Sequence, residues 1–381
     1  MRVLILGGTK FVGRTIAEHA LAAGHTVTIT NRGSTPPLAA DLFPDAEFIP
    51  GDRLGDLREL ADRTWDVAID VNGYLPLAVK KSAQALAGSV GLYCYISTIS
   101  VYDTDDPPMN GKPSTAEQRA ALFAAGGVDE SGALLPFDGT ADPMTLTQQQ
   151  STAPGKPAFD PLYGHNAYGS LKALCEAAAA AALKPEQLLV LRLGVVAGAN
   201  DHSGRLSYWP MRVRDGGEAL WPPADAPLQF IDAADVARWC VSLCEKKTAG
   251  VYNTVGTQAS GTLGDRPTFG DLAAASVALV KAAGGTPAKI VHASESFLEE
   301  SLKQYTELPL WQPANSSLHS MSNAKAVAAG LTFRATIDTL RDALETGAPL
   351  PVGGAYGIEK VKEQNLLQMI LQARTHQANK L

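Results

Sequence analysis

A tyrosine and a lysine stand four residues apart at the start of an alanine-rich segment, in Tyr168-Gly-Ser-Leu-Lys172. In a helix, this spacing places both side chains on one face. A nearby ammonium stabilises a phenolate, so Tyr168 would lose its proton more easily and could act as a general base or acid. Thr98, with Ser100 close to it, follows an apolar run and could hold the same substrate oxygen. These residues predict proton transfer to or from the oxygen of a substrate hydroxyl or carbonyl group.

A glycine-rich loop lies near the N-terminus, directly after the apolar run Val3–Leu6 and before a helical pattern over 11–23. Glycines there permit a tight turn and close packing, and a helix N-terminus offers free N–H groups to a pyrophosphate. The loop therefore predicts a dinucleotide site, and Lys172 is also placed to hold the cofactor ribose. The predicted cofactor contacts in the loop are Gly7, Thr9, Lys10, Phe11, Val12 and Gly13.

The end of the second predicted strand indicates which cofactor is bound. An NAD enzyme usually carries a carboxylate there, but this chain has Asn31 followed by Arg32. An arginine suits a 2′-phosphate, which favours NADP over NAD. Asp52, with Arg53 beside it, is placed to contact the adenine edge. Alternatively, Asp52 could cap the N-terminus of a predicted helix that contains Leu54. Asn72 and Gly73 end the fourth strand, where the backbone must approach the cofactor.

A second group of residues is predicted to face a substrate. An arginine next to aromatic rings suits an anionic or nucleotide-bearing small molecule. The alternative for this segment is a solvated loop with packed tryptophans. His165 could instead be a neighbour of a helix cap without a role in binding. The predicted substrate residues are Ser100, Tyr163, His165, Arg205, Trp209 and Arg212.

Short apolar runs alternate with amphipathic segments, which is typical of a parallel sheet covered on both faces. We therefore predict an α/β fold, a doubly wound Rossmann sheet with a smaller C-terminal substrate lobe. The predicted strands are Val3–Leu6, Val27–Thr30, Glu47–Pro50, Val67–Val71, Leu92–Ser97, Leu188–Leu193 and Val251–Val255.

The predicted division of the chain into domains follows this alternation of strands and helices. Residues 1–195 form the dinucleotide-binding domain, interrupted by a polar insertion at 103–160 and completed by 230–256. The insertion, with a short helix near Ala116–Ala125, would cover a site or an interface. Residues 196–229 and 257–345 form the substrate lobe, with helices near 268–284, 294–304, 322–329 and 335–346. The tail, 346–381, is helical, and its apolar face indicates core packing or a homodimer contact.

Composition excludes several classes of protein. Lysine plus arginine is 32 and aspartate plus glutamate is 39, so the net charge of −7 argues against nucleic acid as a partner. No apolar run is long enough for a membrane span, and no signal-peptide pattern precedes the first strand, which predicts a cytoplasmic protein. Cys94, Cys175, Cys240 and Cys244 lie in apolar runs without metal-ligand spacing, so we predict buried thiols and no metal site.

Together these motifs resemble the extended, atypical short-chain dehydrogenase/reductases of the NAD-dependent epimerase/dehydratase family. Within that family, Gly7-Gly8-Thr9 with Phe11 and Gly13 and the later Gly51-Asp52-Arg53 are most similar to the branch of the chloroplast stem-loop-binding proteins. The resemblance implies Thr98, Tyr168 and Lys172 as a catalytic trio. It also rests on 97–102, 191–198, 229–236 and 252–256.

The departures from the family pattern narrow the chemistry. Ile99 and Ser100 stand where sugar-nucleotide dehydratases carry an Asp-Glu pair, and Lys10 replaces the middle glycine of the loop. What the resemblance then implies is hydride transfer at a secondary carbinol or ketone of a sugar, nucleotide sugar or similar polar metabolite. The alternatives are an epimerase that works by transient oxidation with retained cofactor, and a non-catalytic nucleic-acid-binding relative.

Overall fold

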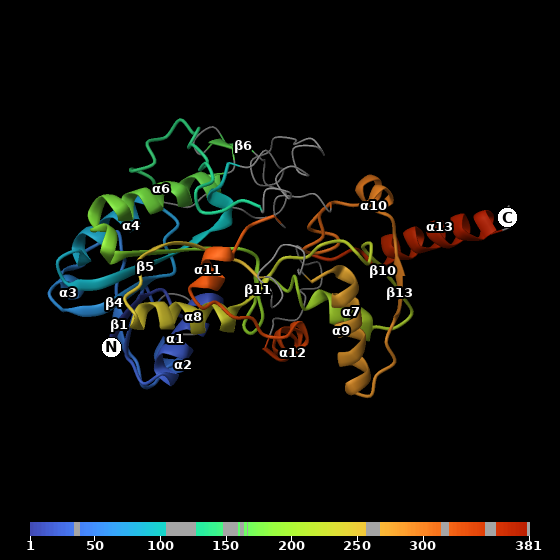
Figure 1. The fold of residues 1–381 in the computed structure, drawn as a ribbon, viewed down its shortest axis with the longest axis horizontal. Coiled ribbons are helices and arrows are strands. Elements are labelled where there is room, and N and C mark those ends of the chain that lie inside the picture. The colour runs from blue at the N-terminus through green and yellow to red at the C-terminus, as the bar shows by residue number, and fades with distance from the viewer. Residues whose placement is uncertain are drawn as a thin grey trace.

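The structure is a computed structural model that describes residues 1–33, 39–103, 127–147, 159–160, 164–165, 167–256, 267–313, 320–346 and 356–378. An α/β body holds the N-terminus, and a smaller, mostly helical lobe lies beside it (Figure 1). The last helix, α13 (Lys360–Ala378), projects from that lobe. The helix predicted near Ala116–Ala125 lies outside the described residues.

The body is built on a seven-stranded, wholly parallel sheet with the order β12-β8-β5-β4-β1-β2-β3. All seven predicted strands are confirmed, with ends no more than two residues from the prediction. The strands are β1 (Arg2–Leu6), β2 (Thr26–Asn31), β3 (Glu47–Pro50), β4 (Trp65–Asp70), β5 (Val90–Thr98), β8 (Leu188–Leu193) and β12 (Gly250–Thr254). The predicted fold class is therefore correct.

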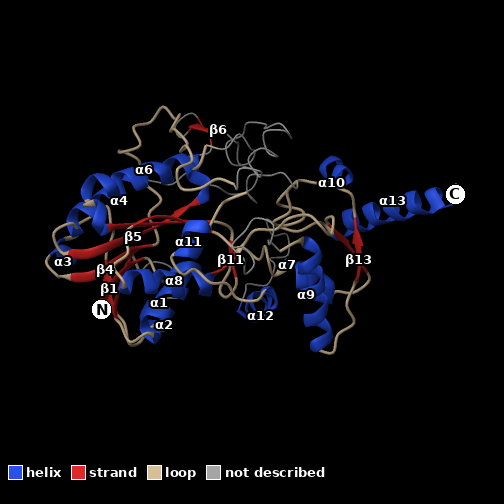
Figure 2. Ribbon diagram, in the orientation of Figure 1, coloured by secondary structure: helices blue, strands red, loops and turns tan. Residues whose placement is uncertain are grey.

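Helices cover both faces of this sheet (Figure 2). On one face lie α1 (Phe11–Ala22) and α8 (Ala233–Glu245), which share one apolar core with the sheet. On the other lie α4 (Pro76–Leu86) and α6 (Ala167–Ala182), with a second core. The short helices α2 (Ala39–Leu42) and α3 (Arg58–Ala61) flank β3. The strand order reverses beside β1, which is where a doubly wound sheet opens a crevice at its carboxyl edge.

The smaller lobe has its own core of large aromatic side chains. Trp209, Trp221, Phe269 and Trp311 are all 0% exposed, and the rings of Trp209 and Trp221 lie 4.4 Å apart. The lobe elements are α7 (Tyr208–Arg214), β10 (Glu218–Trp221), α9 (Phe269–Ala282), β13 (Lys289–His292), α10 (Glu295–Ser301) and α12 (Thr336–Thr346). The parallel pair of β10 with β13 was not expected from the sequence.

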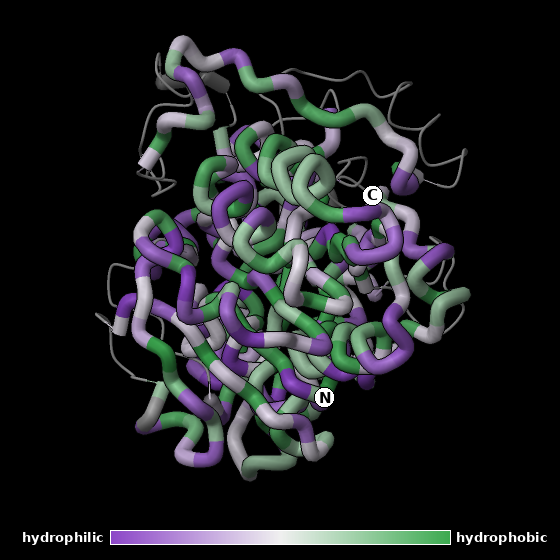
Figure 3. The backbone as a smooth tube through the Cα atoms, turned by 90° about the vertical axis from the view of Figure 1, so that its left-hand side faces the viewer, coloured by the Kyte–Doolittle hydropathy of each residue, from purple (hydrophilic) through white to green (hydrophobic). Residues whose placement is uncertain are grey.

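Hydrophobic stretches alternate with hydrophilic ones over the whole body rather than gathering at one end (Figure 3). This agrees with separate apolar cores inside the body and inside the lobe. No helix in the ranges given above is both long and apolar enough to cross a membrane.

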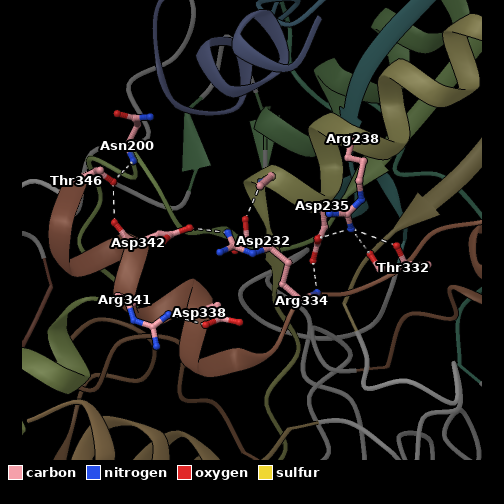
Figure 4. A network of polar contacts seen from close by, with 11 residues as sticks. Asn200, Asp232, Asp235, Arg238, Thr332, Arg334, Asp338, Arg341, Asp342 and Thr346 are labelled. Carbon is pink, nitrogen blue, oxygen red and sulfur yellow. Dashed lines mark hydrogen bonds and ion pairs between the residues drawn. The ribbon is translucent and has the colours of Figure 1, made fainter. Parts of the chain in front are cut away.

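The lobe is tied to the body by a short strand pair and by ion pairs. β9 (Val196–Ala197) pairs with β11 (Ile231–Asp232), and α11 (Ala324–Ala328) packs on β12. Arg334 donates to Asp232 at 3.1 Å and to Asp342 of α12 at 2.6 Å (Figure 4). Asp232 also caps α8 by accepting a bond from the backbone of Ala234. These carboxylates thus serve the junction between the two parts.

The described part of the predicted insertion, 127–147, packs against both parts of the molecule. The backbone N–H of Leu135 donates to the carbonyl of Val101, and that of Val128 to the carbonyl of Ser320, both at 2.8 Å. A two-stranded pair, β6 (Phe159–Asp160) with β7 (Gly164–His165), follows. The division of the chain into domains at the residues given above stays a prediction.

Candidate functional site

A cleft of about 1120 Å³ opens at the carboxyl edge of the sheet, beside the ends of β1, β2, β4, β5 and β8. Its opposite wall comes from the lobe, through His202, Arg205, Tyr305 and Gln312. A single small-molecule site usually has about 300–1,000 Å³. The cleft therefore has room for a dinucleotide and a second ligand.

The glycine loop lines one end of this cleft. Gly7 and Gly8 have φ angles of 112° and 90°, which glycine adopts without strain. A Cβ on Gly13 would lie 2.9 Å from the amide nitrogen of Gly8, so only glycine lets α1 approach the loop this closely. Lys10 is exposed and makes no capping bond with its side chain, which leaves the first N–H groups of α1 for an anion. Thr9, Phe11 and Val12 complete this wall.

Asn31 and Arg32 lie at the end of β2, where the sequence predicts cofactor selection. The Asn31 side chain accepts a bond from the backbone N–H of Gly33 at 2.7 Å, so it shapes the turn. Arg32 is exposed and lines the cleft. Within the described part of the chain, its guanidinium has neither a hydrogen-bond nor an ion-pair partner. It is therefore available to a negatively charged ligand.

The side chains of Asp52 and Arg53 both bind other residues of the protein, which the sequence did not indicate for Arg53. Asp52 accepts a bond from the backbone N–H of Leu54 at 2.9 Å, which stabilises a turn rather than a helix start, because α3 begins only at Arg58. Asp52 also lines the cleft, as predicted for a cofactor contact. Arg53 forms a two-bond ion pair with the fully buried Asp70, at 2.8 and 2.5 Å. Arg53 also lines the cleft, so a contact with the cofactor stays a prediction. The charge of Arg53 neutralises Asp70, because a buried carboxylate needs a partner.

Thr98, Tyr168 and Lys172 meet in the middle of the cleft. Thr98 is the last residue of β5, Tyr168 lies in the first turn of α6, and Lys172 lies one turn later. The buried Lys172 ammonium donates to the backbone carbonyls of Gly73 at 3.0 Å and Ile96 at 2.6 Å. The Thr98 hydroxyl donates to Ser100 at 3.2 Å. The fold thus brings Thr98 next to Tyr168 and Lys172, from which it is about 70 residues distant in the sequence, with Asn72 and Gly73 beside them.

The electrostatics of this group differ from the expectation in one respect. Burial raises the pKa of the Tyr168 phenol and Tyr74 raises it further, whereas hydrogen bonding with Thr98 and the charge of Arg205 lower it. Burial also lowers the pKa of Lys172 to about 8. The sequence predicts that the Lys172 ammonium makes the Tyr168 phenol lose its proton more easily. The Tyr168 phenol instead holds its proton more tightly than a free tyrosine, and the cation that opposes this is Arg205.

A buried ionic network joins the strand that carries Thr98 to the helix that carries Tyr168. The Ser97 hydroxyl donates to Glu176 of α6 at 2.6 Å. Arg192 of β8 donates to both oxygens of Glu176, with the shortest bond at 2.7 Å, and to the Tyr102 hydroxyl at 2.8 Å. The network therefore fixes α6 on β5 next to the three reactive groups.

Of the predicted substrate residues, Arg205 and Ser100 reach the cleft. Arg205 is half-buried, and it donates to the hydroxyls of Tyr305 at 2.6 Å and Ser203 at 2.9 Å. No carboxylate of the described ranges pairs with it. Other buried or half-buried arginines do have such partners: Arg53, Arg192, Arg212 and Arg334. The unneutralised charge of Arg205 suits an anionic ligand.

Trp209 and Arg212 do not reach the cleft, which corrects their prediction. Trp209 is 0% exposed in the core of the lobe, where its indole N–H donates to the carbonyl of Pro309. Arg212 pairs with Glu363 of α13 at 2.8 Å. An arginine beside aromatic residues occurs in structural helices as well as in binding sites, so the pattern could not separate the two. Tyr163 and the side chain of His165 lie outside the described residues.

Several residues of the cleft were not foreseen. Tyr74 follows Asn72 and Gly73 directly, so its place after a strand end could have indicated it. Tyr305 and Gln312 come from a part of the lobe without a local motif, and only the tertiary structure brings them here. Thr147 comes from the predicted insertion, and its presence agrees with a segment that lies over the site.

Three cysteines come together in the body, although their spacing shows no metal motif. The sulfurs of Cys94, Cys240 and Cys244 lie within 4.8 Å of one another, and all three are buried. Hydrogen bonding and burial raise the pKa of the Cys94 and Cys244 thiols, whereas hydrogen bonds with those two thiols lower the pKa of Cys240. Cys94, Cys240 and Cys244 all belong to the apolar core of the sheet, where buried thiols pack as small side chains.

Comparison by sequence finds no matching protein-family model and no matching curated protein. Comparison by structure finds many similar solved structures, among them those of three sugar-nucleotide enzymes. UDP-N-acetylglucosamine 4-epimerase from Bacillus cereus has a TM-score of 0.56 and 17% identity over 90% of this chain and 98% of its own. UDP-glucuronic acid 4-epimerase from Bacillus cereus, in complex with NAD, has a TM-score of 0.54 and 16% identity over 91% of this chain and 96% of its own.

The third is UDP-glucose 4-epimerase from Thermus thermophilus in complex with NAD, with a TM-score of 0.53 and 16% identity over 91% of this chain and 98% of its own. This chain shares their fold. The likeness extends over nearly the full length of each protein, so the lobe is included as well as the sheet. None of the three is a stem-loop-binding protein, and the narrower resemblance to that branch has no support from them.

Proposed function

We propose that this chain is a nicotinamide-dependent oxidoreductase of the extended short-chain dehydrogenase/reductase type. Its reaction would be hydride transfer at a secondary carbinol or ketone of a sugar, nucleotide sugar or similar polar metabolite. One observation carries the proposal: Thr98, Tyr168 and Lys172 converge in a cleft that also contains a glycine loop and an uncapped helix N-terminus.

The chain's own groups have separate tasks in this reaction. Tyr168 takes the hydroxyl proton during oxidation and returns it during reduction. Thr98 donates a hydrogen bond to the same substrate oxygen and fixes its position. Lys172 holds the cofactor ribose, because its ammonium lies beside Tyr168 on the same helix face. A bound nicotinamide would supply the hydride acceptor or donor.

The residues present fit a dinucleotide with a 2′-phosphate. The loop has no room for a Cβ at Gly13, and the first amides of α1 are free to bind a pyrophosphate. Arg32 supplies an unpaired guanidinium where NAD enzymes usually have a carboxylate. We therefore propose NADP as the preferred cofactor and NAD as the weaker one.

Arg32→Ala should reduce this preference. A charge-assisted hydrogen bond contributes about 1.5–3 kcal/mol, so we expect the affinity for NADPH to fall roughly tenfold to a hundredfold while that for NADH changes little. Fluorescence titration of both cofactors measures the ratio. Arg58→Ala is the matched control, since Arg58 is 85% exposed and does not line the cleft. An unchanged ratio in Arg32→Ala would show that another group selects the cofactor.

Epimerisation is the second candidate, because the three structural neighbours are epimerases. An epimerase returns the hydride to its own substrate and must keep its cofactor, whereas a reductase exchanges it at every turnover. We expect protein purified without added nucleotide to release little cofactor on denaturation, measured by chromatography. Near-stoichiometric release would favour the epimerase.

The reaction itself is tested with a panel of UDP-sugars and NADP⁺ or NAD⁺, by following the absorbance of reduced nicotinamide and the sugar products. Arg205 makes an anionic substrate the best fit, because its charge is not neutralised by the fold. A panel that yields neither reduced nicotinamide nor a changed sugar, although the nucleotides bind, would contradict the proposed activity.

A further inference from the structure

The turn after β4 is held in place from two sides. Lys172 and the Tyr95 hydroxyl both donate to the carbonyl of Gly73, at 3.0 and 2.6 Å. A Cβ on Gly73 would lie 2.5 Å from Cε2 of Tyr95, so the backbone passes against that ring. These contacts therefore fix the position of the next residue, Tyr74, in the cleft wall.

Tyr74 lies against both reactive groups of α6. The Lys172 ammonium is 5.4 Å from the centre of the Tyr74 ring and 4.3 Å from that of Tyr95. The ring centres of Tyr74 and Tyr168 are 6.3 Å apart, with the planes inclined by 40°. The ring thus borders the phenol and the ammonium at once.

The Tyr74 hydroxyl takes no part in the hydrogen bonding of the described residues. The hydroxyls of Tyr93, Tyr95 and Tyr102, in contrast, each donate to a partner at 2.6–2.7 Å. The fold therefore uses the ring of Tyr74 rather than its hydroxyl. A ring in this position covers a cation and excludes water from it.

We propose that Tyr74 is a positioning residue whose ring closes the cleft wall beside Lys172 and Tyr168 and keeps water from that pair. This inference rests on the proposed function, since it concerns the lysine that holds the cofactor. Water exclusion explains why the pair departs from its ordinary protonation, with the pKa of Lys172 lowered to about 8 and that of Tyr168 raised.

Other groups also face the pair and remain constant in the test. They are Asp70 and Tyr95 from the strands, Arg53 from the loop before α3, Cys175 and Glu176 from α6, and Arg205 from the lobe. None of them is changed by a substitution at position 74.

The test is the pH dependence of NADPH affinity, measured by fluorescence without substrate. A protonated Lys172 attracts the anionic cofactor, so we expect the wild-type affinity to fall as the pH rises through about 8. In Tyr74→Ala water reaches the ammonium, its pKa rises toward the ordinary value of about 10.4, and the fall begins at higher pH. Tyr74→Phe keeps the ring and should follow the wild type.

Tyr74→Leu is a second variant in case the alanine protein does not fold, and it should show an intermediate shift. Leu77→Ala, a truncation on the adjacent helix α4 away from the cleft, is the matched control and should show none. An unshifted profile in both Tyr74→Ala and Tyr74→Leu, or an equal shift in Tyr74→Phe, would overturn the inference. Absence of NADPH and NADH binding in the wild type would instead count against the proposed function.

Discussion

Tyr168→Phe should lower single-turnover hydride transfer by about 10²–10⁴-fold, the usual contribution of a general acid–base group. The substitution removes one oxygen from a side chain that lines the cleft beside Thr98. It changes little volume, and the Lys172 ammonium keeps its two bonds to backbone carbonyls. The fold and the cofactor affinity should therefore survive.

The measurement is rapid mixing of cofactor-loaded protein with the substrate found in the panel. Tyr74→Phe is the comparison, because it also removes a phenolic oxygen from the cleft wall, and that hydroxyl has no hydrogen bond to the described residues. Transfer in Tyr168→Phe within a few-fold of the wild type would mean that another acid acts. Thr98→Val should lower the turnover with nearly unchanged cofactor binding.

Glu176→Gln should destabilise the protein by about 3–5 kcal/mol, because it leaves the buried charge of Arg192 without its partner. Glu176 accepts bonds from Ser97 and from Arg192, and both of its partners are buried. Turnover of the folded fraction should fall as well, since this network holds α6 against the strand end that carries Thr98.

Denaturant unfolding gives the stability, and Glu47→Gln serves as the control. Glu47 pairs with Arg63 at the surface, with 48% of its side chain exposed, and such pairs contribute about 0–1 kcal/mol. Arg192→Leu combined with Glu176→Leu should recover part of the loss, since an apolar pair needs no charge partner. A loss below about 1 kcal/mol in Glu176→Gln would show that water or another cation replaces the network.

The sheet could be predicted from the sequence because its signals are local. A strand buried on both faces must be a nearly continuous apolar run, as in Val3–Leu6 and Leu188–Leu193, and polar or glycine residues mark where it ends. The glycine loop was predictable for the same reason, since the conformations of Gly7 and Gly8 depend on their own residue type.

Side-chain roles that depend on distant partners could not be predicted in this way. Arg53 and Arg205 look equally suited to a ligand in the sequence, but Arg53 forms an ion pair with Asp70, whereas the hydrogen bonds of the Arg205 guanidinium to the described residues go to hydroxyl groups. Trp209 and Arg212 occur in the same segment as Arg205, yet α7 turns them into the lobe core and toward α13.

The sequence by itself thus determined the doubly wound sheet, the glycine loop and the helix face shared by Tyr168 and Lys172, because local conformation and burial pattern specify all three. Only the tertiary structure decided which charges remain free for a ligand, that Tyr74 and Tyr305 line the cleft, and that burial shifts the protonation of the reactive pair. Each of these depends on contacts between residues far apart in the chain, and the free energy of a charge is set by what surrounds it rather than by its neighbours in sequence.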